Sequence, residues 1–120
     1  EARAIERTNR RSPSKTPKIS HVQACLPGDL PIIAATDYVR ALPQLIAPYL
    51  EGRLVALGTD GFGRSDKRAV LRKFFEVDSK SIAIAAIEAL ARAGMIEYSE
   101  LTAALKKYEI DGDTPAPWTI

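Results

Sequence analysis

The sequence has a single cysteine, a single histidine and a single tryptophan among its 120 residues. With one thiol, Cys25, no internal disulfide can form. The only imidazole, His21, lies four residues from Cys25 and could share a helix face with it, but one imidazole and one thiol do not make a zinc ligand set. No secretory signal is visible at the N-terminus, so we expect a reduced, cytoplasmic protein.

Long apolar runs are also missing. The most apolar segment, from Ile82 to Ala91, is interrupted by Glu88. A membrane-spanning helix needs about 20 consecutive apolar residues, so this pattern excludes one.

The charge is small overall, at +2, but uneven along the chain. Six basic residues occur in the first eighteen positions, against two acidic ones, Glu1 and Glu6; the basic residues are Arg3, Arg7, Arg10, Arg11, Lys15 and Lys18. We call this segment the basic arm. It carries no interleaved aromatic residue for stacking on bases, so a solvated helix and linker is favoured over a nucleic-acid-binding arm.

The chain divides by pattern into two regions. Residues 1–11 favour a helix, the proline-rich stretch 12–17 ends it, and residues 19–26 predict a single helical turn or irregular structure. We therefore predict a helix and proline-rich connector over 1–30 and an α/β domain over 31–120.

Two strand-then-helix units open the second region. Residues 31–35 predict a strand buried on both faces, and Thr36 or Asp37 could cap the helix that follows. Because an interior proline breaks a helix, Pro43 predicts a kink or a late start near Leu42. Residues 53–58 form the second strand, leading into a glycine-rich loop.

Three further helices follow. The first has Ser65 or Asp66 as its cap and places its basic residues opposite an apolar side; these basic residues are Lys67, Arg68, Arg72 and Lys73. The second begins at Asp78 or Ser79, ends at Gly94 and is apolar enough to be buried on most sides. The third starts near Ser99 and ends before a tail that carries Trp118. The pattern is that of an α/β layered fold with a small parallel sheet, and two strands are so few that we expect the segment to belong to a larger unit.

The glycine-rich loop 58–66 is the one place where glycines, carboxylates and an arginine meet a predicted helix start. Its glycines follow the order G-x-x-G-x-G, which is not the dinucleotide fingerprint, and it lacks the P-loop lysine. The loop could present backbone N–H groups to an anion or could be a structural turn whose glycines permit unusual dihedral angles. Both interpretations stay open.

No self-contained active site can be drawn from the sequence. Asp60 and Asp66 have no nearby histidine or second cysteine to complete a transition-metal site. Residues 111–113 resemble the start of a calcium loop but lack its later glycine and glutamate. We therefore predict no catalytic, cofactor-binding or metal residue in this chain.

The loop and the residues after it nevertheless form a specific pattern. The unbroken run 59–66, TDGFGRSD, is followed by Leu71, by Phe74-Phe75-Glu76-Val77-Asp78, and by Ile82 with Ala85-Ala86. This resembles the C-terminal domain of the homodimeric pyruvate dehydrogenase first component, in the transketolase-like superfamily. The resemblance extends over Ala34-Ala35-Thr36-Asp37-Tyr38 and Tyr108-Glu109-Ile110-Asp111; Thr8 and Pro43 depart from the family pattern. It implies part of a three-layer α/β/α domain with a small, mostly parallel sheet and C-terminal helices.

What the resemblance implies about function concerns a much longer enzyme. Such an enzyme decarboxylates pyruvate on thiamine diphosphate with magnesium and acetylates the lipoyl group of the dihydrolipoyl transacetylase component. This chain contains no thiamine diphosphate motif, so we expect it to bind neither cofactor and to be inactive alone. Its expected role is structural, in packing against the remaining domains and the dimer mate, with Asp60, Phe62, Arg64 and Asp66 facing the neighbouring domain.

Two other classes of function remain as alternatives. The chain could be a stand-alone protein-interaction module that uses the basic arm and the helix carrying Leu101, Leu105 and Tyr108. It could also be a small α/β body with a nucleic-acid-binding arm. If the sheet ends at two strands, its exposed edges should promote association of the isolated chain.

Overall fold

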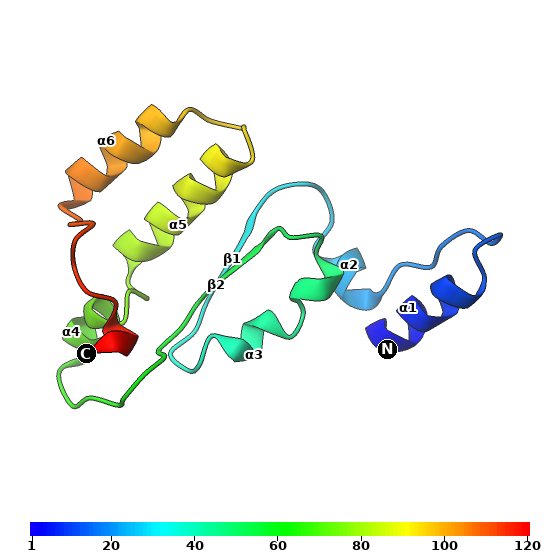
Figure 1. Cartoon of the computed structure of the whole chain (residues 1–120), viewed down its shortest axis with the longest axis horizontal. Helices are drawn as coiled ribbons and strands as arrows, with labels where there is room; N and C mark the ends of the chain where they lie inside the picture. The colour runs from blue at the N-terminus through cyan, green and yellow to red at the C-terminus, as the bar shows by residue number, and fades with distance from the viewer.

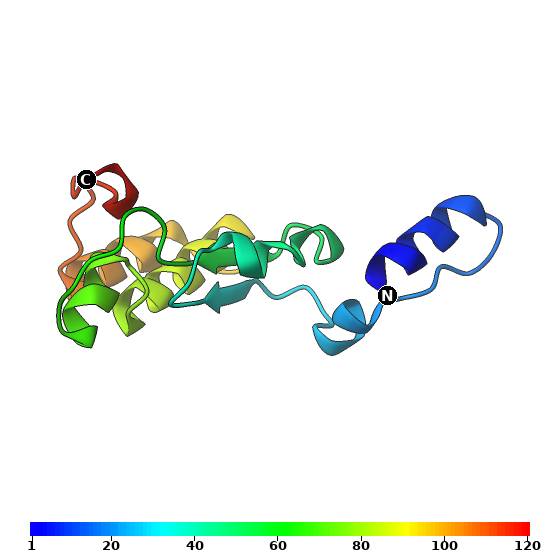
Figure 2. The ribbon, with the colours of Figure 1, turned by 90° about the horizontal axis from the view of Figure 1, so that it is seen from below.

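The computed structural model describes all residues, 1–120, and shows an extended molecule rather than a sphere (Figure 1). Its principal extents are 52 × 35 × 21 Å, and the radius of gyration is 17.5 Å. A compact chain of this length would have a radius of gyration of about 14 Å. The difference arises because a small N-terminal unit projects from the layered body (Figure 2).

The body is built on two short parallel strands. Strand β1 spans Ile32–Ala35 and strand β2 spans Leu54–Leu57, in a register that pairs Ile32 with Leu54 and Ala35 with Leu57. The crossover between them carries helix α3, Ala41–Gln44, and the 3-10 helix η1, Ala47–Tyr49. The predicted α/β class with a small parallel sheet is confirmed.

Helices cover both sides of this sheet. Figure 1 shows α3 on one side of the strands and α5, Ser79–Arg92, on the other, with α6, Tyr98–Tyr108, outside α5. Three alanines of these two helices are buried, namely Ala89 and Ala91 on α5 and Ala104 on α6. The two helices lie against each other and supply a large share of the small core.

The start of α5 confirms the predicted cap at Asp78. Its Oδ1 atom accepts a hydrogen bond from the Ser81 N–H at 2.9 Å, which satisfies one of the free donors of the first turn. Gly94 follows the helix with φ +73°, a left-handed conformation that glycine adopts without strain. The expectation that α5 is buried on most sides is only partly confirmed, because Ala89 and Ala91 alone are fully buried.

Two other predicted caps are wrong. The helix after β1 begins at Ala41, the late start that Pro43 predicted, and its N-cap is Arg40 without a side-chain hydrogen bond. The Thr36 hydroxyl instead accepts a hydrogen bond from the Tyr38 N–H at 3.2 Å, which closes a local turn. Pro43 lies in the first turn, where its missing N–H has no intrahelical partner to lose.

Helix α4, Arg68–Phe74, starts later than predicted and has Lys67 as its N-cap. Asp66 does not cap it, because its Oδ1 atom accepts from the adjacent Lys67 N–H at 2.6 Å. The chain ends in a second 3-10 helix, η2, Pro117–Thr119, where only an irregular tail was expected.

The N-terminal unit consists of α1, Ala2–Arg11, which was predicted, and α2, His21–Cys25, which is the helical turn that was one of two possibilities for residues 19–26. Asn9 closes the connector between them: its side chain donates to the Lys18 carbonyl at 2.8 Å and accepts from the Lys18 N–H at 2.9 Å. The Arg53 guanidinium then joins this region to the sheet by donating to the carbonyls of Leu26 at 2.7 Å and Leu30 at 3.0 Å. The boundary at residue 30 stays a prediction.

Much of the apolar surface is uncovered. Only 8 of the 120 residues are buried, and the accessible surface is 8950 Å². A compact monomer of this mass would expose about 6,400 Å². Strand β1 is only partly buried rather than buried on both faces: Ala35 is exposed, and no further strand pairs with its outer edge. No helix has the length and apolar character needed to cross a membrane.

Candidate functional site

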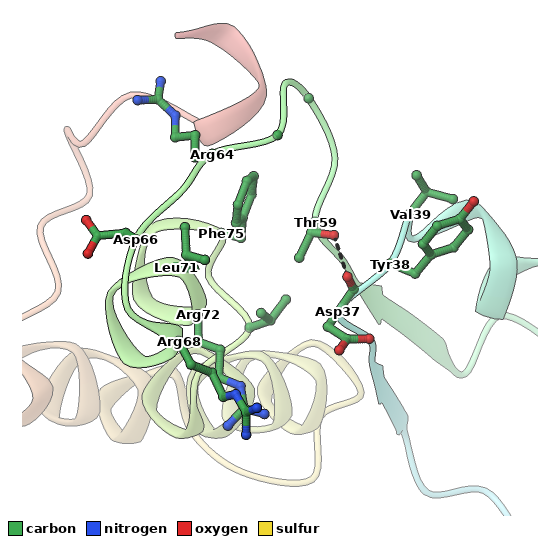
Figure 3. Close-up of a pocket in the computed structure, with 13 residues that line it drawn as sticks. Asp37, Tyr38, Val39, Thr59, Arg64, Asp66, Arg68, Leu71, Arg72 and Phe75 are labelled. Atoms are coloured by element: carbon green, nitrogen blue, oxygen red, sulfur yellow. Dashed lines mark hydrogen bonds between the residues drawn. The ribbon is translucent and has the colours of Figure 1, made fainter.

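A hollow of about 680 Å³ lies where the carboxyl ends of β1 and β2 meet (Figure 3). The carboxyl edge of a parallel sheet is the usual place for binding sites in open α/β folds. Residues 37–39 after β1, the glycine-rich loop after β2, and α4 with Phe75 and Val77 beyond it line this hollow. The site therefore combines the segments that follow β1 and β2 in the two strand-then-helix units predicted from the sequence.

The glycine-rich loop is held tightly against residues 37–40, which follow β1. The Thr59 hydroxyl donates to the Asp37 carbonyl at 2.9 Å, and the Thr59 N–H donates to the Tyr38 carbonyl at 2.9 Å. A Cβ atom at Gly58 would lie 2.5 Å from the Arg40 nitrogen. Glycine is thus required at position 58 by close approach of two backbone segments.

The C-terminal turn covers the other side of the loop. Gly61 has φ +96°, and a Cβ atom there would lie 2.9 Å from the Trp118 Cα. Pro117, in the same turn, is buried. Sequence reasoning missed this contact; the available signal was a tryptophan that directly follows two closely spaced prolines in the C-terminal tail.

The four residues predicted to form an interface take different positions. Asp60 is turned toward the start of α3, where its Oδ1 atom accepts from the Arg40 N–H at 3.2 Å and its Oδ2 atom lies 3.4 Å from Arg40 Nε. Phe62 is 87% exposed and projects from the loop. Arg64 and Asp66 both line the hollow. The structure therefore groups Arg64 with Asp66 and separates them from Asp60.

Arg64 has an aromatic partner. Its guanidinium carbon lies 4.3 Å from the centre of the Phe74 ring, a cation–π arrangement. This contact holds the arginine at the upper rim of the hollow, near the C-terminal turn (Figure 3). Whether the four residues face a neighbouring domain stays a prediction.

Arg68 and Arg72 are site residues that the sequence analysis assigned only to the polar side of a helix. Both line the hollow, and neither forms an ion pair. The signal that could have found them is their spacing, since two residues four apart in a helix are neighbours on one face.

The alternative interpretation, in which the loop presents backbone N–H groups to an anion at a helix start, lacks a suitable helix. Helix α4 has only seven residues and begins after the loop, and Asp66 already occupies the Lys67 N–H. His21 and Cys25 do share a face of α2, with Cys25 Sγ 3.4 Å from His21 Nε2, but they belong to the N-terminal unit and not to the hollow. The hollow presents cationic side chains above an apolar floor. This combination suits contact with the surface of another protein segment.

Comparison with known proteins gives a family match over most of this region. The model of the transketolase-like TK C-terminal domain matches residues 9–78. The pyruvate dehydrogenase E1 component of Cupriavidus necator is 46% identical over 121 residues, covering 100% of this chain and 14% of that protein. The protein of the same name from Pseudomonas aeruginosa is 46% identical, covering 95% of this chain and 13% of its own length. The one from Escherichia coli K12 is 38% identical, covering 93% and 13% respectively.

The chain spans about a seventh of the length of these relatives, since it covers 14% of the Cupriavidus protein. The family match includes β1, β2, the glycine-rich loop and α4, which together build the hollow. The resemblance read from residues 59–66 is confirmed, and so is the fold that it implied. The chain belongs to the transketolase-like TK C-terminal domain family.

Proposed function

We propose that this chain is the C-terminal structural and dimerisation domain of a pyruvate dehydrogenase first component. The full-length enzyme would decarboxylate pyruvate on thiamine diphosphate with magnesium and acetylate the lipoyl group of a dihydrolipoyl transacetylase partner, in the cytoplasm. The observation that carries the proposal is a large uncovered surface on a chain that is 38–46% identical to pyruvate dehydrogenase E1 components.

The size of that surface supports a packing role. The accessible surface of 8950 Å² exceeds that of a compact monomer by about 2,500 Å². This excess is comparable with what one partner contributes to a large obligate interface. Large apolar side chains are exposed on several elements, among them Leu45 at 70% and Phe62 at 87%.

The sheet supports the same role. It has two strands only, so β1 and β2 each present one unpaired edge. Free N–H and C=O groups along a parallel strand are normally covered by a further strand or a helix. Neighbouring domains of the full-length enzyme would supply that cover.

The residues of this chain do not fit a magnesium ion. Magnesium prefers oxygen ligands, and no group of three or more carboxylate, histidine or cysteine side chains lies together here. The hollow places three arginines beside Asp37 and Asp66, which is not a magnesium site. The proposal therefore leaves thiamine diphosphate and magnesium to the rest of the enzyme, and no catalytic step passes through this segment.

The test compares three proteins: the full-length product of the gene, a variant of it that lacks residues 31–120, and the 120-residue chain alone. Turnover is measured as pyruvate-dependent reduction of an artificial electron acceptor with thiamine diphosphate and magnesium, and mass in solution by light scattering. We expect activity in the full-length protein only, and dimers in the full-length protein but not in the truncated variant. A truncated variant that stays dimeric and fully active would overturn the structural role.

The alternative of a stand-alone interaction module rests on the basic arm. Helix α1 stands apart from the body in Figure 2, and among its arginines only Arg10 has an acidic neighbour, Glu6 at 3.9 Å. Absence of pyruvate-dependent turnover in all three proteins would favour this alternative. A variant with Arg3 and Arg7 changed to glutamate would then be the one to test for lost partner binding, with Lys73→Glu on α4 as the control.

A further inference from the structure

Two arginines in the hollow have no counter-charge in this chain. Arg68 and Arg72 lie one turn apart on α4, and Figure 3 shows their side chains extending in the same direction. Neither guanidinium lies within 4.0 Å of a carboxylate oxygen, whereas Arg40 and Arg92 do have such partners. The pair is therefore a concentrated positive charge at the carboxyl edge of the sheet.

Such a pair is unfavourable by itself. Like charges four residues apart in a helix destabilise it by a few tenths of a kcal/mol. The carboxylates nearby do not relieve this, because Asp66 accepts from the Lys67 N–H and Asp37 forms no ion pair across the hollow. A single anionic group placed between the two guanidinium groups would remove the repulsion and gain charge-assisted hydrogen bonds.

The surroundings indicate a protein carboxylate rather than a polyanion. Phe75 and Val77 form an apolar floor, at 8% and 9% exposure, and Tyr38 is exposed at the rim. Arginine and tyrosine beside apolar side chains are typical of protein–protein contacts. Asp37 and Asp66 stand against three arginines in the same lining, which leaves a net charge of about +1 that one carboxylate can balance, whereas a nucleic-acid backbone brings several negative charges.

We propose that the hollow receives an aspartate or glutamate side chain from a neighbouring domain of the full-length enzyme, bridged by Arg68 and Arg72. The guanidinium fork matches the two oxygens of a carboxylate, so the contact fixes the orientation of the domain as well as attracting it. This inference rests on the proposed function, because it requires a domain outside these 120 residues. It adds Arg68 and Arg72 to the interface predicted from the loop.

The test uses zero-length crosslinking in the full-length enzyme. Arg68→Lys and Arg72→Lys each place a primary amine in the hollow while keeping the positive charge, and a carbodiimide joins an amine to a carboxylate in direct contact. Mass spectrometry then identifies the crosslinked peptide. Lys73 is the internal control, since it lies on the same helix, about 100° around from Arg72, and does not line the hollow.

We expect a crosslink from position 68 or 72 to one aspartate or glutamate outside this chain, and none from Lys73 to that residue. Arg72→Glu should lower the thermal unfolding midpoint of the enzyme more than Lys73→Glu does. Changing the identified carboxylate to lysine in the Arg72→Glu background should restore the midpoint.

Crosslinks that reach only Asp37 or Asp66, or none at all, would overturn the proposal. A rise in the unfolding midpoint with inorganic phosphate at constant ionic strength, abolished by Arg72→Glu and without the expected crosslink, would overturn it too and assign the hollow to a small anion. The crosslink is read independently of turnover. A crosslinked protein without pyruvate-dependent activity would therefore refute the proposed function and leave the interdomain contact standing.

Discussion

Single residues hold the glycine-rich loop in place by backbone proximity more than by side-chain bonds. Gly58 is the clearest case, because a side chain there would meet the Arg40 nitrogen at 2.5 Å and the Tyr38 carbonyl oxygen at 2.7 Å. Both clashing atoms belong to the backbone, so no side-chain rotation can relieve the contact. The same two segments are joined by the Thr59 hydrogen bonds to Asp37 and Tyr38.

Gly58→Ala is therefore expected to push the glycine-rich loop away from the backbone of residues 38–40. The free energy of unfolding should fall by about 1–3 kcal/mol, the range for overpacking. The measurement is hydrogen exchange of the Thr59 amide in the full-length enzyme, which should become faster. Gly63→Ala is the matched control, since a Cβ atom at Gly63 would meet nothing within 4 Å. Equal exchange in the two variants would refute the close-approach argument.

Prediction from single residues succeeded where the local structure depends on one residue and its neighbours in sequence. It failed where the structure depends on residues far apart in sequence. Pro43 predicted the late start of α3 because its effect on the preceding turn is local. The contact between Gly61 and Trp118 could not be predicted, because it joins residues far apart in sequence. The pairing of Arg68 with Arg72 was not predicted, although their helical spacing could have indicated it, and their lack of a counter-charge required the structure.

At the scale of elements, α5 is the helix best specified by the sequence. An N-cap carboxylate at Asp78 and a left-handed glycine at Gly94 mark its two ends, and both act as predicted. Helix α4 shows why the same reasoning can fail. Asp66 has the right side chain for a cap, but its oxygen bonds the very next N–H, and the chain turns into the helix two residues later.

Asp78→Ala should consequently destabilise α5 by about 1 kcal/mol, because the Ser81 N–H loses its acceptor at 2.9 Å. Asp78→Asn should retain most of the stability, since an amide oxygen can also accept at an N-cap. The check is hydrogen exchange of the first-turn amides, with Ser79→Ala as the control at an exposed neighbour that does not cap the helix. If alanine and asparagine gave the same exchange rates, the cap would have no energetic role.

The order of strands and helices in the body could be predicted from the sequence, but how deeply each strand is buried could not. Strand-then-helix patterns predicted the parallel pair and the helices around it, but β1 was expected to be buried on both faces and is only partly buried. An apolar run indicates that a strand packs against other apolar surfaces. It does not indicate whether those surfaces belong to the same 120 residues or to another domain.

For the whole molecule, this uncovered surface leads to a prediction about the isolated chain. With 8 buried residues and two free strand edges, the 120-residue chain has few ways to hide its apolar side chains except by association. Sedimentation velocity should therefore show species heavier than the 13.1 kDa monomer, in proportions that rise with concentration.

The association should depend on the exposed apolar side chains and not on charge in general. Leu45→Glu combined with Phe62→Ser removes two side chains that are 70% and 87% exposed, so helix content should be unchanged while the heavier species decrease. Lys106→Glu, at an exposed polar site on α6, should leave association as it is. A folded, concentration-independent monomer would mean that the exposed surface is tolerated in solution, which would remove the main physical support for packing against other domains.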